Sequence, residues 1–179
     1  MATPQLLFAA TYDNLDNAWI VPAAILVGSG TGVVATTGCF FSGPQGCVIE
    51  DLYYIARDLT FTDPANDVRI GYQISYSSDG GVTYTTVATV VADADCPVIW
   101  DDTENDYGDF VLDTPLKAFT FVGAGTGGLT APSYVDPIHI PANVNVMIEV
   151  APVDSGSVYD VSTAEIDAFD VLVFGYYKG

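Results

Sequence analysis

A run of acidic side chains between residues 93 and 113 is the densest group in this chain that could do chemistry. Carboxylate oxygens are hard ligands of the kind that Ca²⁺ prefers. The candidate calcium ligands in this run are Asp101, Asp102, Glu104 and Asp106. The spacing departs from an EF-hand loop, because Tyr107 stands where that loop requires glycine. The run is therefore interpreted either as a calcium site or as a solvated acidic loop.

Groups suited to catalysis are scarce elsewhere. His139 is the single histidine, and Pro137 and Pro141 on either side of it favour an extended surface or interface segment over a general base. The chain contains no G-x-S-x-G elbow, phosphate-binding loop or H-E-x-x-H motif. Two carboxylates could hydrolyse a glycosidic bond, but no pair stands out among 23 acids. We therefore expect a protein that is not an enzyme and that has no cofactor, calcium being the one exception left open.

Trp100 is the aromatic residue best suited to exposure, because it stands next to Asp101, whereas Trp19 falls within an apolar run. An aromatic ring beside a carboxylate suits the apolar face and the hydroxyl groups of a sugar. Trp100 and Tyr107 are therefore the candidate glycan platform. The alternative is that these rings belong to the core, as most aromatic side chains of a β-sandwich do.

The charge balance excludes several classes of partner. Against 23 acids stand four Lys and Arg residues, which gives a formal charge of −19 at pH 7. Such a charge repels nucleic acid and anionic membranes. The first residues lack the features of a secretory signal, and Pro22 and several glycines interrupt the one apolar stretch of membrane-spanning length, residues 18–37. We expect an acidic globular protein that binds neither nucleic acid nor membrane.

The elements that position these side chains are predicted to be β-strands, because apolar and polar residues alternate with a period of two. The clearest cases are residues 143–150 and 68–76. Further strands are expected at 5–12, 19–27, 32–41, 47–62, 82–92, 109–113, 117–122, 136–140, 157–161 and 168–177. Turns rich in Gly, Ser, Asp and Pro separate them, without alternating helices. The sequence predicts an all-β fold, an antiparallel, jelly-roll-like β-sandwich, with an extended N-terminal arm (1–17) and a single domain (18–179).

The last predicted strand is apolar on both faces, so it is either central in the sandwich or covered by another subunit. The second alternative makes the N-terminal arm and this strand the candidate contacts of a homo-oligomer. The candidate interface residues are Leu6, Leu7, Phe8, Val171, Leu172, Val173 and Phe174.

Two short motifs concern turns. Residues 77–84, SSDGGVTY, resemble the Asp-box with Tyr84 in the tryptophan position, and we expect a hairpin in which Gly80 and Gly81 adopt positive φ and the Asp79 carboxylate accepts bonds from turn amides. A single copy implies neither a propeller nor a glycosidase. Cys39 and Cys47 bracket a second turn, where they either form a disulfide or serve as small buried hydrophobes.

The SSDGGVTY hairpin, the VNVMIEV strand and the FDVLVFGYYKG terminus together resemble the β-sandwich virion proteins of tailed viruses, especially capsid decoration (cement) proteins and fibre domains. The resemblance implies a non-enzymatic homo-oligomer, a trimer in many such proteins, that assembles in the host cytoplasm. It would bind the major capsid protein on the outer surface of the virion and stabilise the shell. Two alternatives are a carbohydrate- or receptor-binding module at a fibre or spike tip, and a subunit of an extracellular filament or surface layer.

Overall fold

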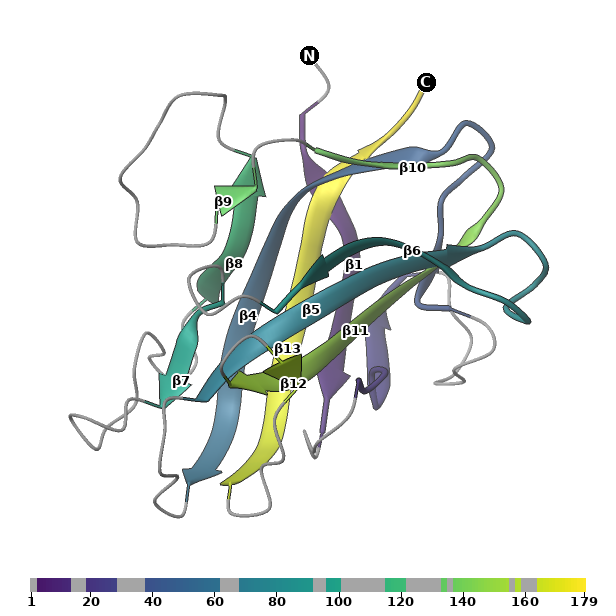
Figure 1. Ribbon diagram of the computed structural model, residues 1–179. Coiled ribbons are helices and arrows are strands. Elements are labelled where there is room, and N and C mark those ends of the chain that lie inside the picture. Colours follow the sequence, from purple (N-terminus) through teal and green to yellow (C-terminus); the bar gives the residue numbers. More distant parts are fainter. Residues whose placement is uncertain are drawn as a thin grey trace.

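A computed structural model describes residues 3–13, 19–28, 38–61, 68–91, 96–100, 115–121, 133–134, 137–154, 157–158 and 164–179. These residues form two β-sheets that pack face to face (Figure 1). All strand pairs are antiparallel except one short parallel pair, β8 (Pro115–Phe121) with β9 (Ser133–Tyr134). The prediction of an all-β, antiparallel sandwich is confirmed. The described residues include no helix that could span a membrane.

The first sheet has seven strands in the order β2-β1-β13-β4-β8-β9, with β10 pairing the beginning of β4. Besides β8 and β9, its strands are β1 (Gln5–Tyr12), β2 (Ala24–Val27), β4 (Cys47–Phe61), β10 (Ile138–Ile140) and β13 (Ala164–Tyr177). The long strands β4 and β13 lie side by side at its centre (Figure 1).

The second sheet has six strands in the order β12-β11-β5-β6, with β3 pairing β11 and β7 pairing β5. Its strands are β3 (Phe40–Phe41), β5 (Val68–Ser77), β6 (Thr85–Val90), β7 (Val98–Trp100), β11 (Asn145–Asp154) and β12 (Ser157–Val158). The β5–β6 pair is the hairpin expected around residues 77–84.

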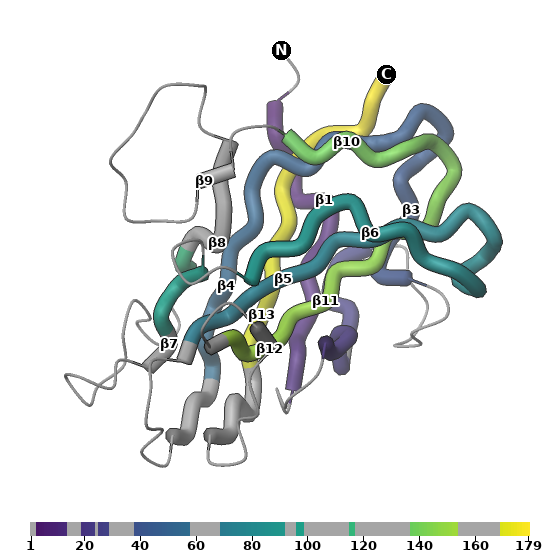
Figure 2. The backbone as a smooth tube through the Cα atoms, in the orientation of Figure 1, coloured from purple at the N-terminus to yellow at the C-terminus, as the bar shows by residue number. Residues whose placement is uncertain are grey.

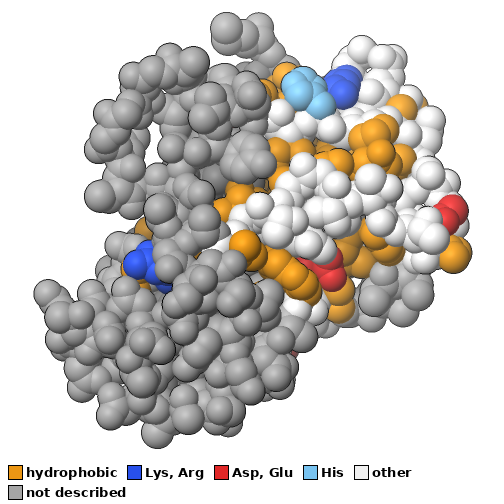
Figure 3. Space-filling model, viewed as in Figure 1, with side chains coloured by type: hydrophobic (Ala, Val, Ile, Leu, Met, Phe, Trp, Pro, Cys, Tyr) orange, Lys and Arg blue, Asp and Glu red, His pale blue; other side chains and the backbone are white. Residues whose placement is uncertain are grey.

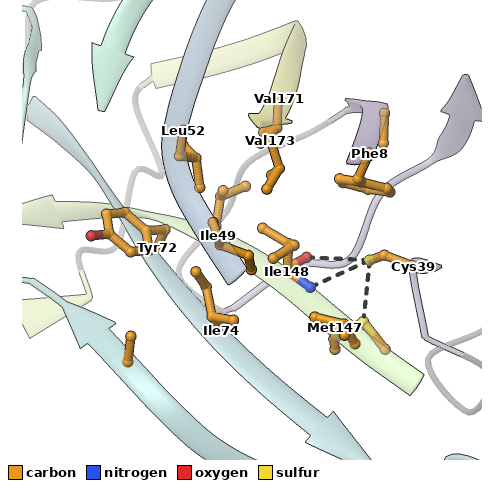
Figure 4. Close-up of a cluster of buried hydrophobic side chains, with 14 of the residues drawn as sticks. Phe8, Cys39, Ile49, Leu52, Tyr72, Ile74, Met147, Ile148, Val171 and Val173 are labelled. Carbon is orange, nitrogen blue, oxygen red and sulfur yellow. Dashed lines mark hydrogen bonds between the residues drawn. The ribbon is translucent and has the colours of Figure 1, made fainter. Parts of the chain in front are cut away.

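The core lies between the sheets, where alternate residues of each strand point inward. On β11 the apolar set that the sequence places on one face is buried, including Val146, Ile148 and Val150. Ile70, Tyr72 and Ile74 of β5 are buried in the same layer. Figure 4 shows how side chains of β4 and β13 meet those of β5 and β11. The period-two pattern therefore identified the core face of both strands.

Residues 5–12, predicted as a strand within an N-terminal arm, form a strand that belongs to the first sheet. β1 pairs with β13 from Gln5, opposite Gly175, to Tyr12, opposite Phe169, and its other edge pairs with β2. β1 thus begins where β13 ends, at the same end of the sandwich (Figure 2). The physical reason is that Phe8 and Tyr12 bury their rings in the core, and that β1 satisfies the edge of β13 that an arm would leave unpaired.

Gly175 marks a close approach of β13 to β4. A Cβ atom at this position would collide with the carbonyl oxygen of Val48 and would also lie 2.9 Å from Leu7 Cδ1. The register between the two strands shifts at the same point, between Phe174 and Gly175. The strand can pass here only because the residue has no side chain.

Candidate functional site

The outer face of the seven-stranded sheet, which points away from the core, carries a groove of about 320 Å³. We call this the outer groove. Its lining residues are Pro4, Asp51, Tyr53, Ile55, Pro115, Leu172 and Phe174. They come from β4 and β13, from the residue before β1, and from the start of β8. Strand register brings them together, since Leu172 pairs with Tyr53 and Phe174 with Asp51.

Two aromatic rings contribute to the lining of the outer groove. Tyr53 and Phe174 meet edge to face, with centroids 5.6 Å apart and ring planes at 82°. This is a favoured geometry for an aromatic pair. Both residues are partly exposed on a pair of strands whose opposite faces are buried. The two rings therefore lie on the outer face of two paired central strands.

The chemistry of the outer groove is mainly apolar. Six of its seven lining side chains present apolar surface, and Asp51 contributes the carboxylate. An apolar partner side chain entering it would gain free energy by leaving water, at about 25 cal/mol per Å² buried. A mainly apolar recess with one carboxylate can bind an apolar side chain.

An ion pair stands next to the outer groove on the same face. Arg57 Nε lies 2.9 Å from Asp170 Oδ2, and Thr11 Oγ1 donates to Asp170 Oδ1 at 2.7 Å. Asp170 pairs in register with Ile55, which lines the groove. These contacts join β1, β13 and β4, so they brace the strands that carry the groove.

Only part of the predicted interface remains open to a partner. Leu7, Phe8, Val171 and Val173 are buried, and Figure 4 shows Phe8, Val171 and Val173 among the core side chains. The prediction that these four form an intersubunit contact is wrong for the folded chain, because the second sheet covers the inner face of the first and Leu7 packs beside Gly175. Leu6, Leu172 and Phe174 are partly exposed, and the last two line the outer groove.

Most residues of the other predicted sites lie outside the part of the chain that the structure describes. Asp101, Asp102, Glu104, Asp106 and Tyr107 lie outside the described residues, and of Trp100 only the backbone, at the end of β7, is described. Within the described part of the chain, no three His, Cys, Asp or Glu side chains converge as a metal site would require. His139, the single histidine of the chain, is exposed on β10 opposite Val48 of β4 (Figure 3, pale blue).

The Asp79 carboxylate forms its hydrogen bonds within its own turn. Its Oδ1 accepts hydrogen bonds from Ser77 Oγ and from the amides of Val82 and Thr83, and its Oδ2 accepts from Thr83 Oγ1 at 2.6 Å. Gly80 and Gly81 have φ of 78° and 92°, as expected. Bonds from Thr83, with smaller contributions from Ser77 and Val82, hold the Asp79 pKa well below its ordinary value. The carboxylate therefore stabilises the hairpin.

The three cysteines are free and buried. Cys39 Sγ lies 3.8 Å from the Ile148 carbonyl oxygen and 3.7 Å from Met147 Sδ, and it accepts from the Ile148 amide at 3.3 Å (Figure 4). Burial raises the pKa of Cys39 to about 12 and that of Cys47 to about 11. Of the two interpretations of Cys39 and Cys47, the structure supports small buried hydrophobes.

Sequence reasoning named Leu172 and Phe174 but missed their partners on β4. A signal was present, because residues 52–56, LYYIA, place apolar or aromatic side chains on both faces, as the last strand does after Asp170. Leu52, Tyr54 and Ala56 are buried in the core, whereas Tyr53 and the largely buried Ile55 line the outer groove. Two adjacent strands with this property indicate an apolar outer face.

Comparisons with protein-family models, curated proteins and solved structures gave no match for this chain.

Proposed function

We propose that this chain is a non-enzymatic structural protein of a virion, a capsid decoration protein that binds the outer shell and stabilises it. The observation that carries the proposal is the outer groove, an apolar recess on a rigid sheet face of a protein with a formal charge of −19. Recessed apolar surface of this kind is typical of protein-binding sites. The resemblance of the strands and hairpin to virion proteins adds the class of partner, the major capsid protein.

The mechanism is adhesion. An apolar side chain of the shell enters between Tyr53 and Leu172, and surrounding contacts exclude water from it. A standard interface of about 1,600 Å² per copy suffices when symmetry repeats it over a particle. The carboxylates that remain in solvent keep decorated particles from aggregating.

Rebinding to stripped capsids tests this proposal. The purified chain is mixed with capsids from which it has been removed, and binding is followed by co-sedimentation and by the melting temperature of the shell. Wild type is expected to bind and to raise the melting temperature. Leu172→Asp, which places a charge in the outer groove, is expected to lower the affinity at least tenfold.

The matched control is Val82→Asp, because Val82 is 80% exposed at the hairpin tip and the change in net charge is identical. It should bind as wild type does. If wild-type protein neither sediments with the capsids nor stabilises them, the chain is not a decoration protein. Equal binding by Leu172→Asp and wild type would exclude the outer groove as the contact.

One observation favours a second candidate, a carbohydrate-binding module. Tyr53 and Asp51 line the same recess, which places a partly exposed ring and a carboxylate where a sugar could reach both. A glycan array probed with wild type and with Tyr53→Ala decides the matter. Specific binding that Tyr53→Ala abolishes would establish this function; a blank array combined with capsid binding would support decoration.

A further inference from the structure

β2 is an edge strand with unusual exposure of apolar side chains. Among the described residues it pairs with β1 alone, so its other edge has no partner strand there (Figure 2, indigo, beside the purple β1). Ile25 packs against the core, whereas Leu26 and Val27 are 60% and 42% exposed. An edge strand presents a row of backbone donors and acceptors that a further strand can pair.

The segment that leads into β3 of the second sheet lies close to the end of β2 and extends this apolar surface. A Cβ atom on Gly28, directly after β2, would lie 3.0 Å from the Cys39 carbonyl oxygen and 3.4 Å from Phe40 Cβ. The next residue, Phe41 of β3, is 39% exposed. Leu26, Val27 and Phe41 therefore lie on the same side of the sandwich, where the two sheets meet. We call this side the β2 edge.

The β2 edge belongs to a part of the sequence without charge. None of residues 17–49 is Asp, Glu, Lys, Arg or His, although the chain carries a formal charge of −19. Native edge strands are commonly protected by charged side chains or proline, and β2, with the sequence AILV, has neither. Depletion of charge with retention of large apolar side chains is also the composition of an interface core.

We propose that two copies of this chain associate through their β2 edges. The two β2 strands pair antiparallel about a two-fold axis and continue the seven-stranded sheet from one copy into the other. Leu26, Val27 and Phe41 cover the junction on both sides of the axis. This inference rests on the edge itself and does not depend on the proposed function.

The charge of the chain and the self-complementarity of an antiparallel strand edge favour a second copy of this chain as the partner at the β2 edge. Two molecules of charge −19 repel each other, so they can approach closely only where few carboxylates face one another, and Leu26, Val27 and Phe41 of the β2 edge come from a segment of the sequence without acids. A basic partner would instead be drawn to the acid-rich segments. An antiparallel strand edge is complementary to itself, because each residue's donor and acceptor meet those of its symmetry mate.

Sedimentation velocity of the full chain at several salt concentrations tests the proposal. Wild type is expected to form a dimer whose association strengthens as salt rises, because screening weakens the repulsion between the acidic copies while leaving the apolar contact intact. Leu26→Asp is expected to weaken association at least tenfold at each salt concentration. Because Leu26 is largely exposed, the variant should keep the melting temperature of the monomer.

Val82→Asp is again the control, since it adds the same charge at an exposed apolar residue of the β5–β6 hairpin, outside β2 and β3, and should leave the dimer intact. Hydrogen exchange supplies a second measurement: amides of residues 24–27 should become more protected as wild-type concentration rises, and those of Leu26→Asp should not. A wild type that stays monomeric at all salt concentrations would overturn the proposal. So would a trimeric mass, or equal effects of the two variants.

Discussion

Arg57 and Asp170 form an ion pair across β4 and β13, with Nε and Oδ2 2.9 Å apart. The two ends differ in exposure, because the Arg57 side chain is 44% exposed and that of Asp170 only 11%. Asp170 therefore depends on Arg57 and Thr11 for hydrogen bonds that water would otherwise supply.

Arg57→Ala is expected to destabilise the protein by about 1–2 kcal/mol, because it leaves a largely buried carboxylate with fewer donors. Asp170→Asn should cost less, since its amide oxygen can still accept from Thr11. In the double variant the unpaired charge is gone, so the loss should be smaller than the sum of the single losses. Urea denaturation measures all three. Strictly additive losses would show that the two side chains do not interact.

Gly175→Ala tests the close approach of β13 to β4. The added methyl group would collide with the Val48 carbonyl oxygen, which is backbone and cannot turn away. We expect a loss of about 2–3 kcal/mol in the free energy of unfolding. Gly179→Ala is the control, because a Cβ there meets nothing within 4 Å, and it should leave the stability unchanged. A harmless Gly175→Ala would mean that the strands do not pass as closely as described.

Asp79 gives stability a defined pH dependence. Its pKa is lowered in the folded chain, so its contribution is fully present above the ordinary aspartate pKa of about 3.9 and is lost as pH falls below that value. Asp79→Asn should therefore lower the melting temperature at neutral pH and have a progressively smaller effect in acid. Thermal melts of both proteins from pH 7 to acid test this. A difference independent of pH would exclude the carboxylate as the cause.

Glu149 should change the stability with pH in the opposite direction to Asp79, and the same thermal melts can measure it. Burial raises its pKa, although Gln73 Nε2 donates to its Oε2 at 3.0 Å and opposes the rise. The folded chain then favours the protonated form, so stability falls as pH rises through the raised pKa. Relative to wild type, Glu149→Gln should gain stability as pH rises from the ordinary glutamate pKa to the raised one. The deficit of Asp79→Asn should already be complete above a pH of about 3.9 and stay constant there.

Thiol labelling tests the burial of the cysteines. In the native protein at mildly alkaline pH, all three should resist a thiol-reactive disulfide reagent, because they are buried and the raised pKa values of Cys39 and Cys47 leave little thiolate. After unfolding in urea, three thiols should react without prior reduction. Recovery of only one reactive thiol would show that a disulfide had formed.

Local patterns in the sequence were sufficient for much of the fold. The hairpin at residues 77–84 needs only neighbours within a few positions: Asp79 bonds to residues 77, 82 and 83, and Gly80 and Gly81 adopt the positive φ that the turn requires. The strand at 5–12 was predicted at its observed bounds, but its place in the sheet was not. That place depends on β13, more than 150 residues away in the chain.

The sequence by itself determined the class of fold, the core faces of β5 and β11, the hairpin and the acidic character of the chain. These follow from period-two alternation, turn chemistry and composition, all of which act over short distances. Only the tertiary structure decided that β13 lies between β1 and β4, that Val171 and Val173 face the core, and that Tyr53 and Phe174 meet on the outer face. Two strands that are apolar on both faces look alike in sequence. Sheet order and register alone determine which of their faces the second sheet covers and which stays open to a partner.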